Sequence, residues 1–434
     1  MPILYIDNFR GFQKTFLPLK EVNFFVGENS TGKTSVLKLV KLLSSQQFWF
    51  DLQFDSEEMD LGFYSEIVSK NSENQSYFEV GIVGDSFDKK SRISAILLRF
   101  INVNGIPRVS EIRMIDKNTE VFVKVEDNNY KFAFKDIDLT EVNDSNKLQY
   151  FRIWIEKNTI SKDDFNKEEF PVGFPVIIWI KTHIYRKLSE SKKNPENINL
   201  DLPHFLYDLT WLAPIRAEPQ RTYDKHKLSF SPEGSHAPYI LKEMLSKSTE
   251  QKKRITKILN RFGKDSGLFK KIDTVSLRDD DTAPFELHIY LDKKPIKISN
   301  VGYGVSQILP LIIEVIRSDY DGWFAIQQPE IHLHPKSQAA FGELIFKSFS
   351  NENKKFIIET HSDYMIDRFR LRTKKEYQNK RKEREIFQVV FFERIEGRNK
   401  LSTININNDG SYSSTQPKKF KDFFIKEQLD LIDL

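Results

Sequence analysis

The sequence contains no cysteine, and this absence removes several kinds of chemistry at once. Disulfide bonds, cysteine-ligated zinc, cysteine-ligated iron–sulfur clusters and thiol catalysis are all excluded. Glycine and proline number only 17 each, so collagen-like and low-complexity chains are excluded as well. A chain without cysteine fits the reducing environment of the cytoplasm.

Long apolar runs and a secretory leader are also missing. The longest apolar stretch lies near Ile308–Ile316 and contains Pro310 and Glu314, whereas a membrane-spanning helix needs about 20 apolar residues. The first residues, MPILYIDNFRGF, are not a basic segment followed by an apolar one, so we expect no signal peptide. The sequence therefore predicts a cytoplasmic protein with no membrane span.

The chain does contain enough apolar material for a large core. Hydrophobic residues make up 39% of the 434 residues, and phenylalanine alone contributes 36. This length is typical of two or three domains, or of one elaborated domain. The formal net charge of +4 neither requires nor excludes nucleic acid, so any basic surface must be local.

Strands and helices alternate at both ends of the chain, which indicates an α/β nucleotide-binding core split by an insertion. Alternating residues between 75 and 140 predict an antiparallel meander, and residues 203–262 are expected to be mostly helical outside a loop at Pro214–Pro219. Further strands are predicted at Ile3–Ile6, Val22–Val26, Trp323–Ile326, Lys355–Glu359 and Phe387–Arg394.

The sequence GENSTGKT at Gly27–Thr34 matches the phosphate-binding pattern G-x-x-x-x-G-K-[ST] at every fixed position. An apolar strand precedes it and an amphipathic helix follows it, which is the context that the motif requires. Its glycines let the backbone approach phosphate oxygens, and the helix N-terminus adds positive potential. We expect Lys33 to reach the β- and γ-phosphates and the Thr34 hydroxyl to bind Mg²⁺.

Such a loop is usually accompanied by an acidic residue at the end of a second strand, which holds the Mg²⁺. The strand predicted at Trp323–Ile326 is followed by QQPEIHLHP, beginning at Gln327. The strand that ends at Glu359 is followed by Thr360, His361 and Ser362.

Taken together, GENSTGKT, VGYGVSQILP, QQPEIHLHP and ETHSDYM resemble the ABC-type ATPases of the OLD-like and SMC-like group, P-loop proteins that hold ATP between two head domains. With the weaker match WLAPIRAEPQRTY, the similar blocks cover about a third of the chain. The resemblance implies an α/β fold, an ABC-type P-loop ATPase head with a mixed sheet flanked by helices and an antiparallel β lobe. Residues 1–140 and 266–434 would form the two parts of this head, and residues 141–265 would be a largely helical insertion.

The resemblance also implies roles for individual residues. Phosphate and Mg²⁺ binding is implied for eight residues of the loop: Gly27, Asn29, Ser30, Thr31, Gly32, Lys33, Thr34 and Ser35. Arg10 and Phe12 lie where the group contacts the nucleotide from its first turn. Gly302–Gln307, with Gly302, Gly304 and Ser306, corresponds to the signature loop that touches the γ-phosphate bound by the opposite subunit. His361 corresponds to the switch histidine, and His332 and His334 lie in the loop that approaches the dimer interface.

The sequence departs from the family pattern at two places. Gly302 stands where the signature loop normally has a serine, for which Ser306 or Ser299 could substitute. Gln327 and Gln328 stand where an acidic Mg²⁺ partner and a catalytic glutamate are expected, and an amide cannot act as a general base. Either the glutamines were introduced to trap ATP or the protein is a naturally slow ATPase. We expect Mg²⁺ and ATP to bind, and catalysis to involve Gln327, Gln328 and His361.

Other polar clusters allow two interpretations each. His332, His334 and His361 could form a metal cluster instead of the roles given above. The segment Asp367–Glu385 is either a solvated helix with internal ion pairs or a nucleic-acid contact. Three adjacent carboxylates at 279–281 suit a polar hairpin tip better than a cation site. Arg216 and Arg221 either bond backbone carbonyls or contact a nucleotide or partner, and residues 420–434 are expected to form a docking helix.

The overall architecture narrows the expected function. Too little chain follows Arg370 for the TOPRIM nuclease of OLD-family proteins, and no sustained heptads of the SMC type occur. The chain therefore resembles the ATPase-only subunits of bacterial anti-phage systems such as Septu, PARIS and retron-associated modules. We expect an ATP-bridged homodimer, or a higher homo-oligomer, that controls a separate effector such as a nuclease. A RecF-like ATPase that acts directly on DNA and a nucleotide-bound scaffold without turnover remain open as alternatives.

Overall fold

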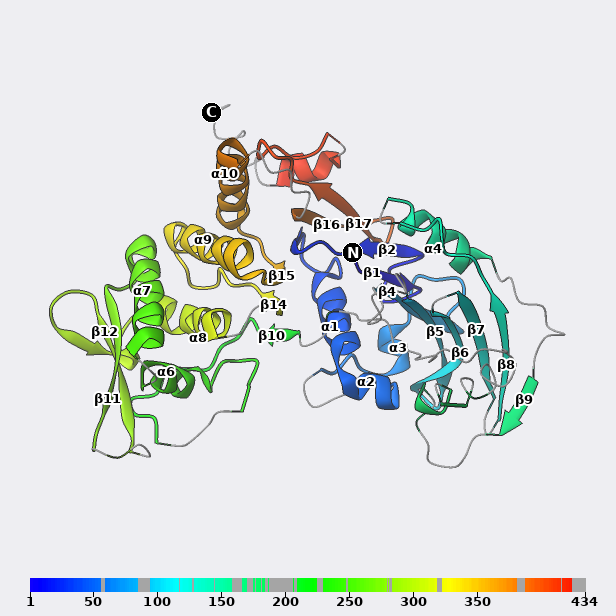
Figure 1. Cartoon of the computed structure of the whole chain (residues 1–434), viewed down its shortest axis with the longest axis horizontal. Helices are drawn as coiled ribbons and strands as arrows, with labels where there is room; N and C mark the ends of the chain where they lie inside the picture. Colours follow the sequence, from blue (N-terminus) through cyan, green and yellow to red (C-terminus); the bar gives the residue numbers. More distant parts are fainter. Residues whose placement is uncertain are drawn as a thin grey trace. The chain divides into compact units, whose positions relative to one another are not determined.

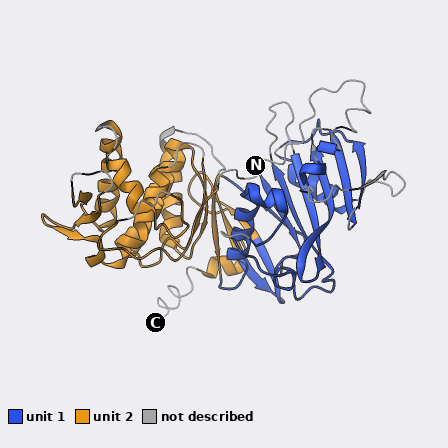
Figure 2. Ribbon diagram, turned by 90° about the horizontal axis from the view of Figure 1, so that it is seen from below, with its two compact units in different colours: residues 1–20, 28–208, 392–401 blue, residues 21–27, 209–391, 402–434 orange. Residues whose placement is uncertain are grey.

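A computed structural model shows the chain folded into two compact units (Figure 2). The first comprises residues 1–20, 28–208 and 392–401, and the second comprises residues 21–27, 209–391 and 402–434. The structure describes residues 1–55, 59–84, 94–116, 118–126, 129–143, 145–157, 166–169, 175, 177–180, 182–183, 186, 206, 209–224, 229–246, 249–278, 280, 283–317, 322–380, 387–414 and 416–423.

The first unit is built on an eight-stranded sheet with the order β2-β1-β4-β5-β6-β7-β8-β9, antiparallel throughout (Figure 1). Its strands are β1 (Ile3–Asp7), β2 (Thr15–Pro18), β4 (Tyr77–Gly84), β5 (Ser94–Val103), β6 (Ile106–Asp116), β7 (Thr119–Glu126), β8 (Asn129–Asp136) and β9 (Asn166–Glu169). The described helices of this unit include α1 (Lys33–Ser44), α2 (Gln46–Asp51), α3 (Tyr64–Ile67) and α4 (Lys147–Glu156). The α4 helix buries Phe151 and Trp154 in a core shared with Tyr5 and Leu97 of the sheet.

A six-stranded sheet has the order β10-β14-β15-β3-β16-β17, and its strands belong to the second unit except for residues 392–395 of β16 and 398–401 of β17. Its strands are β3 (Val22–Gly27), β10 (Thr210–Leu212), β14 (Trp323–Gln327), β15 (Lys355–Glu359), β16 (Phe387–Ile395) and β17 (Arg398–Asn405). The four strands β10, β14, β15 and β3 are parallel to one another, and β3, β14 and β15 are buried almost throughout. Burial on both faces explains why these strands are continuous apolar runs rather than alternating patterns.

Helices and a small sheet complete the second unit. They are α6 (Ala237–Ser246), α7 (Thr249–Ser266), β11 (Lys271–Ser276), β12 (Phe285–Tyr290), β13 (Pro295–Lys297), the 3₁₀ turn η2 (Ile298–Asn300), α8 (Tyr303–Arg317), α9 (Pro335–Glu352) and α10 (Asp363–Lys380).

One buried polar contact links the segment before α6 to α8, because His236 Nε2 lies 2.7 Å from Glu314 Oε1. His236 Nδ1 accepts a hydrogen bond from the Ser231 backbone N–H, so Nε2 carries the proton that is donated to Glu314.

The expected fold class is confirmed, since a mixed sheet flanked by helices and an antiparallel β lobe are both present. The expected meander corresponds to β4–β8, and the carboxylates at 279–281 fall at the β11–β12 hairpin, although positions 279 and 281 lie outside the described residues. The segment at 420–434 is described only to residue 423, where Phe420 packs against Phe391 of the core.

One strand was not predicted. Residues 203–262 were expected to be mostly helical outside one loop, and α6 and α7 lie in this range, but Thr210–Leu212 forms the edge strand β10. Trp211 and Leu212 are buried and pair with Ala325 and Ile326 of β14. A three-residue strand has no periodicity of its own, so only pairing with a distant strand could identify it. Among the described residues, no helix is both long and apolar enough to cross a membrane.

Candidate functional site: a phosphate-binding loop and the carboxyl edge of a parallel sheet

The segment from Gly27 to Lys33 has the backbone of a phosphate-binding loop. Gly27, Ser30 and Gly32 have φ angles of 147°, 62° and 93°, which are conformations that residues with a side chain rarely adopt. The α1 helix begins directly after the loop, at Lys33, and its first turn contains no acidic residue. The backbone N–H groups and the positive end of the helix dipole therefore give this loop a positive potential that favours an anion.

Lys33 is held in this loop by its own side chain. It is only 4% exposed, and its Nζ donates a hydrogen bond of 2.7 Å to the backbone carbonyl of Glu28. Thr31 Oγ1 donates to the same carbonyl at 2.8 Å. These hydrogen bonds hold the loop backbone and the ammonium group of Lys33 close together. A cation beside a ring of backbone N–H groups fits a bound phosphate.

Gly32 and Phe12 fit together so closely that no other residue could replace the glycine. A Cβ at Gly32 would lie 2.5 Å from the Phe12 ring and 3.0 Å from Nδ2 of Asn399. Phe12 is fully buried, and it packs edge-on against Phe392. Phe12 therefore stabilises the loop by packing against Gly32.

Arg10 connects the turn after β1 to the first turn of α1. Its Nη1 donates to Ser35 Oγ at 3.1 Å, and its Nη2 donates to the Leu61 carbonyl at 2.6 Å. Burial lowers the pKa of Arg10, whereas the carboxylates of Glu66 and Asp60 oppose this shift. The guanidinium group remains charged and touches the first turn of α1, next to Thr34.

In the second unit, strand register gathers polar residues at the carboxyl edge of the parallel sheet. Gln327 ends β14 and pairs with Glu359, which ends β15, and Glu359 pairs with Phe25 of β3. The β3 strand ends two residues later, at Gly27. Ligands of open α/β sheets bind at this edge, and Glu359 brings to it a carboxylate that the motif comparison did not identify.

Glu330 organises the loop after β14. Its Oε1 accepts the His361 backbone N–H at 2.7 Å, and its Oε2 accepts the Thr360 hydroxyl at 2.8 Å. Burial raises the pKa of Glu330, while these hydrogen bonds and the charge of Arg216 lower it. Glu330 therefore joins the PEIHLHP loop to the Thr–His–Ser turn.

Arg216 holds the same loop through backbone carbonyls. It is 4% exposed, and its Nη2 donates to the Gln327 carbonyl at 3.0 Å and lies 3.5 Å from the Gln328 carbonyl. Burial lowers the pKa of Arg216 to about 10. Gln328 has a φ of 43°, a strained conformation for a residue other than glycine, so the arginine stabilises the chain where it is strained.

We therefore expect Arg216→Ala to destabilise the protein by about 3 kcal/mol, because it leaves buried carbonyls and the Glu330 carboxylate without their cation. For a unit of this size the melting temperature would fall by about 6–12 °C in a thermal unfolding scan. The matched control is Arg221→Ala, since Arg221 is exposed in the same loop and should change stability by less than about 0.5 kcal/mol. Equal melting temperatures for the two variants would contradict this role.

The signature-loop positions lie at the start of α8. Gly302 has open space around it, and Tyr303 is 58% exposed with its ring 5.8 Å from that of His332. The Ser306 hydroxyl is buried and donates to the Tyr303 carbonyl, so it is turned toward its own helix. Gly304 packs on the His332 carbonyl, which a Cβ would approach to 3.0 Å.

The three histidines of the motifs have separate contacts. His334 Nδ1 caps α9 by accepting the Lys336 N–H, His332 contacts Tyr303, and the His361 backbone bonds Glu330. Within the described ranges, no group of three or more His, Asp or Glu side chains is placed to hold a metal ion.

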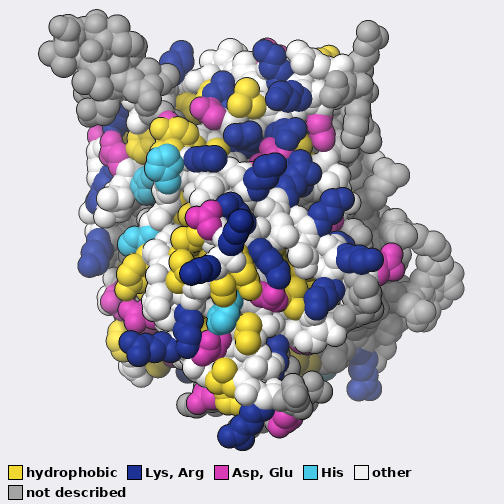
Figure 3. All heavy atoms as spheres, turned by 90° about the vertical axis from the view of Figure 1, so that its left-hand side faces the viewer, with side chains coloured by type: hydrophobic (Ala, Val, Ile, Leu, Met, Phe, Trp, Pro, Cys, Tyr) yellow, Lys and Arg dark blue, Asp and Glu magenta, His cyan; other side chains and the backbone are white. Residues whose placement is uncertain are grey.

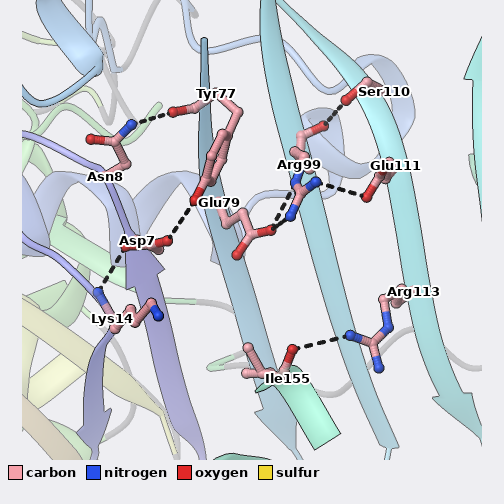
Figure 4. Close-up of polar contacts among 10 residues, drawn as sticks. All are labelled: Asp7, Asn8, Lys14, Tyr77, Glu79, Arg99, Ser110, Glu111, Arg113 and Ile155. Carbon is pink, nitrogen blue, oxygen red and sulfur yellow. Dashed lines mark hydrogen bonds and ion pairs between the residues drawn. The ribbon is translucent and has the colours of Figure 1, made fainter. Parts of the chain in front are cut away.

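The first unit also contains a polar cavity of about 330 Å³ on the face of its sheet that carries α4, whose Ile155 and Glu156 line it. In Figure 4, Arg99 lies between Glu79 and Glu111, and Tyr77 points its hydroxyl at Asp7. Arg113 donates to carbonyls at the C-terminal end of α4. The cationic and anionic side chains that line the cavity are equal in number, so it has no excess of either sign to select a ligand.

A parallel sheet whose β3 strand runs into a complete phosphate-binding loop and helix defines the class, a P-loop nucleoside triphosphatase. The sequence matches the AAA ATPase domain family over residues 2–366, and the chain belongs to this family. No curated protein matches the sequence.

Several solved structures are similar to this chain at low identity. An SMC head bound to the C-winged helix domain of ScpA has 13% identity and a TM-score of 0.46, over 93% of this chain and 98% of that chain. The SMC head domain from Thermotoga maritima has 12% identity and a TM-score of 0.40, over 92% and 97%. An Smc head from Pyrococcus furiosus, with an extended coiled coil, has 13% identity and a TM-score of 0.44, over 99% and 100%. Likenesses of this strength say nothing about function.

Proposed function

We propose that this chain is an ABC-type ATPase of the OLD-like group that dimerises around ATP and Mg²⁺ and controls a separate effector in anti-phage defence. The observation that carries the proposal is the pairing of a complete phosphate-binding loop with an open signature loop. Gly302 and Tyr303 leave the N-terminus of α8 accessible to a second copy of the chain. In the group that the motifs resemble, this loop touches the γ-phosphate bound by the opposite subunit.

The chemistry of the bound state follows from the residues at the two motifs. Lys33 and the loop N–H groups bind phosphate oxygens, and Thr34 and Gln327 are the positions assigned to Mg²⁺. When bound, the metal ion would neutralise charge on the β- and γ-phosphates. His361 would donate a hydrogen bond to the γ-phosphate. Gln327 and Gln328 can orient a water by hydrogen bonds but cannot remove its proton.

The effector part of the proposal depends on the motif resemblance and on a physical requirement. ATP can regulate a partner only if the bridged dimer and the separate heads bind that partner with different affinities. If the ATP-bridged dimer of this cytoplasmic ATPase separates slowly, it keeps the partner in the state set by ATP for long periods. The glutamines at the catalytic positions favour this slow reversal. They also favour the second candidate function, a nucleotide-bound scaffold without turnover.

The dimer is tested by measuring the mass of the protein in solution with and without Mg²⁺ and ATP. We expect the mass to double with ATP for the unaltered chain. The Gly302→Glu variant should bind ATP normally but stay at the smaller mass, because its added side chain has room within its own subunit and places a carboxylate where the partner's γ-phosphate would lie. Normal ATP binding without any change in mass would contradict the dimer, and phosphate release distinguishes the ATPase from the scaffold.

A further inference from the structure

The most basic segment among the described residues of the second unit is the exposed face of α7. This helix buries Ile255, Leu259 and Phe262 against the core of the unit. Its exposed side chains include six cations and two acids: Lys252, Lys253, Arg254, Lys257, Arg261, Lys264, Glu250 and Asp265. The excess of four positive charges equals the formal net charge of the entire chain, +4.

The cations of α7 form a row along the helix. Lys253, Lys257, Arg261 and Lys264 are spaced by four, four and three residues, which places them on one face. At 1.5 Å per residue the row is about 16 Å long. One strand of B-form DNA presents a phosphate every 3.4 Å along the axis, so the row matches about five phosphates.

Most of this charge is available to a partner. Lys253, Lys257 and Lys264 are exposed and make no ion pair with any described residue, and Lys336 of α9 extends the row near Gly267. Figure 3 shows Lys and Arg side chains gathered on the side of the molecule that carries α7 in Figure 1. In the described part of Asp367–Glu385, Arg370 and Arg372 of α10 are paired with Asp367 and Glu343. Two exposed lysines of that helix, Lys374 and Lys375, form no row of the length found on α7.

The composition of this face indicates the kind of polyanion it fits. Its residues are Lys, Arg, Gln, Glu and Asp, with no aromatic side chain on which an unpaired base could stack. Lysines act as point charges and contact phosphates without reading bases. We propose that the α7 row binds the phosphate backbone of duplex DNA without sequence preference. The row shares no residue with the nucleotide loop, and this proposal does not depend on the function proposed above.

The test is fluorescence anisotropy with a labelled 25-base-pair duplex of arbitrary sequence, without nucleotide, between about 50 and 200 mM salt. The triple variant Lys253→Gln, Lys257→Gln, Lys264→Gln should reduce the slope of log affinity against log salt by about three, because each lysine that neutralises a phosphate adds about one to that slope. Its affinity at about 50 mM salt should fall at least tenfold.

The matched control removes three exposed lysines elsewhere in the second unit, in Lys293→Gln, Lys374→Gln, Lys375→Gln. It should keep the slope and affinity of the unaltered chain. The proposal is overturned if the unaltered chain does not bind the duplex at about 50 mM salt, or if the control loses as much affinity as the α7 variant. Tighter binding of single-stranded DNA, or of poly-glutamate as an acidic protein mimic, would also overturn it.

Discussion

Replacing Lys33 by alanine is expected to abolish most of the affinity for ATP. The ammonium group is buried in the loop and is the only side-chain cation of GENSTGKT, so its loss leaves phosphate oxygens without a charged donor. A hydrogen bond to a charged group contributes about 1.5–3 kcal/mol, which corresponds to a weakening of between about 10-fold and about 150-fold. Titration calorimetry with ATP and Mg²⁺ measures this directly.

The control for Lys33→Ala is Lys38→Ala on the same helix. Lys38 is half-buried and five residues further along α1, so its removal tests for a general effect of charge on this helix. It should leave the ATP affinity unchanged. A thermal scan of each variant without ATP shows whether the fold is intact, and only the Lys33 variant should lose the stabilisation that ATP confers. If Lys33→Ala bound ATP as tightly as the unaltered chain, the loop would not be the phosphate site.

Introducing a carboxylate at the end of β14 should increase ATP turnover. Mg²⁺ is usually held by carboxylates and phosphates, and Gln327 offers only a neutral amide oxygen at this edge. A gain of about 1.4 kcal/mol in transition-state stabilisation corresponds to a tenfold faster reaction, so we expect Gln327→Glu to raise Mg²⁺-dependent phosphate release about tenfold or more. The unaltered chain should bind ATP and turn it over slowly.

A second variant, at Glu359, tests whether a carboxylate already present at this edge binds the metal ion. It lies beside Gln327 in the sheet register, so it is the carboxylate that could already serve the metal ion. The Glu359→Gln variant should abolish turnover in the unaltered background if Glu359 has that role. If neither Gln327→Glu nor the unaltered chain hydrolyses ATP, while both bind it and change mass, the ATPase interpretation fails and the scaffold interpretation holds.

The phosphate-binding loop could be predicted from the sequence because consecutive residues form it. GENSTGKT constrains eight consecutive residues, and the flanking apolar strand and amphipathic helix have their own periodicities. The same holds for the antiparallel meander, where alternation along each strand shows which face is buried. The family match over residues 2–366 is consistent with both.

The roles of residues that bond partners far away in the sequence could not be predicted in this way. Nothing in the sequence around Arg216 indicates that it bonds the Gln327 carbonyl, which lies 111 positions away. Asn399 contacts the first turn through Arg10, which is 389 positions away. The many Lys and Arg residues of Asp367–Glu385 allowed either a solvated helix or a nucleic-acid contact, and the structure pairs two of its arginines, Arg370 and Arg372, with carboxylates. The exposed row of lysines on α7 was not identified from the sequence.

The sequence alone therefore determined the class of protein, the phosphate loop and most of the elements, because each depends on residues that are neighbours in the chain. Tertiary structure alone decided that Thr210–Leu212 is a strand, that Glu359 shares an edge with Gln327, and which cations remain exposed. These depend on strand register and on ion pairs between elements. Such contacts form only when the chain brings distant segments together, so no local pattern encodes them.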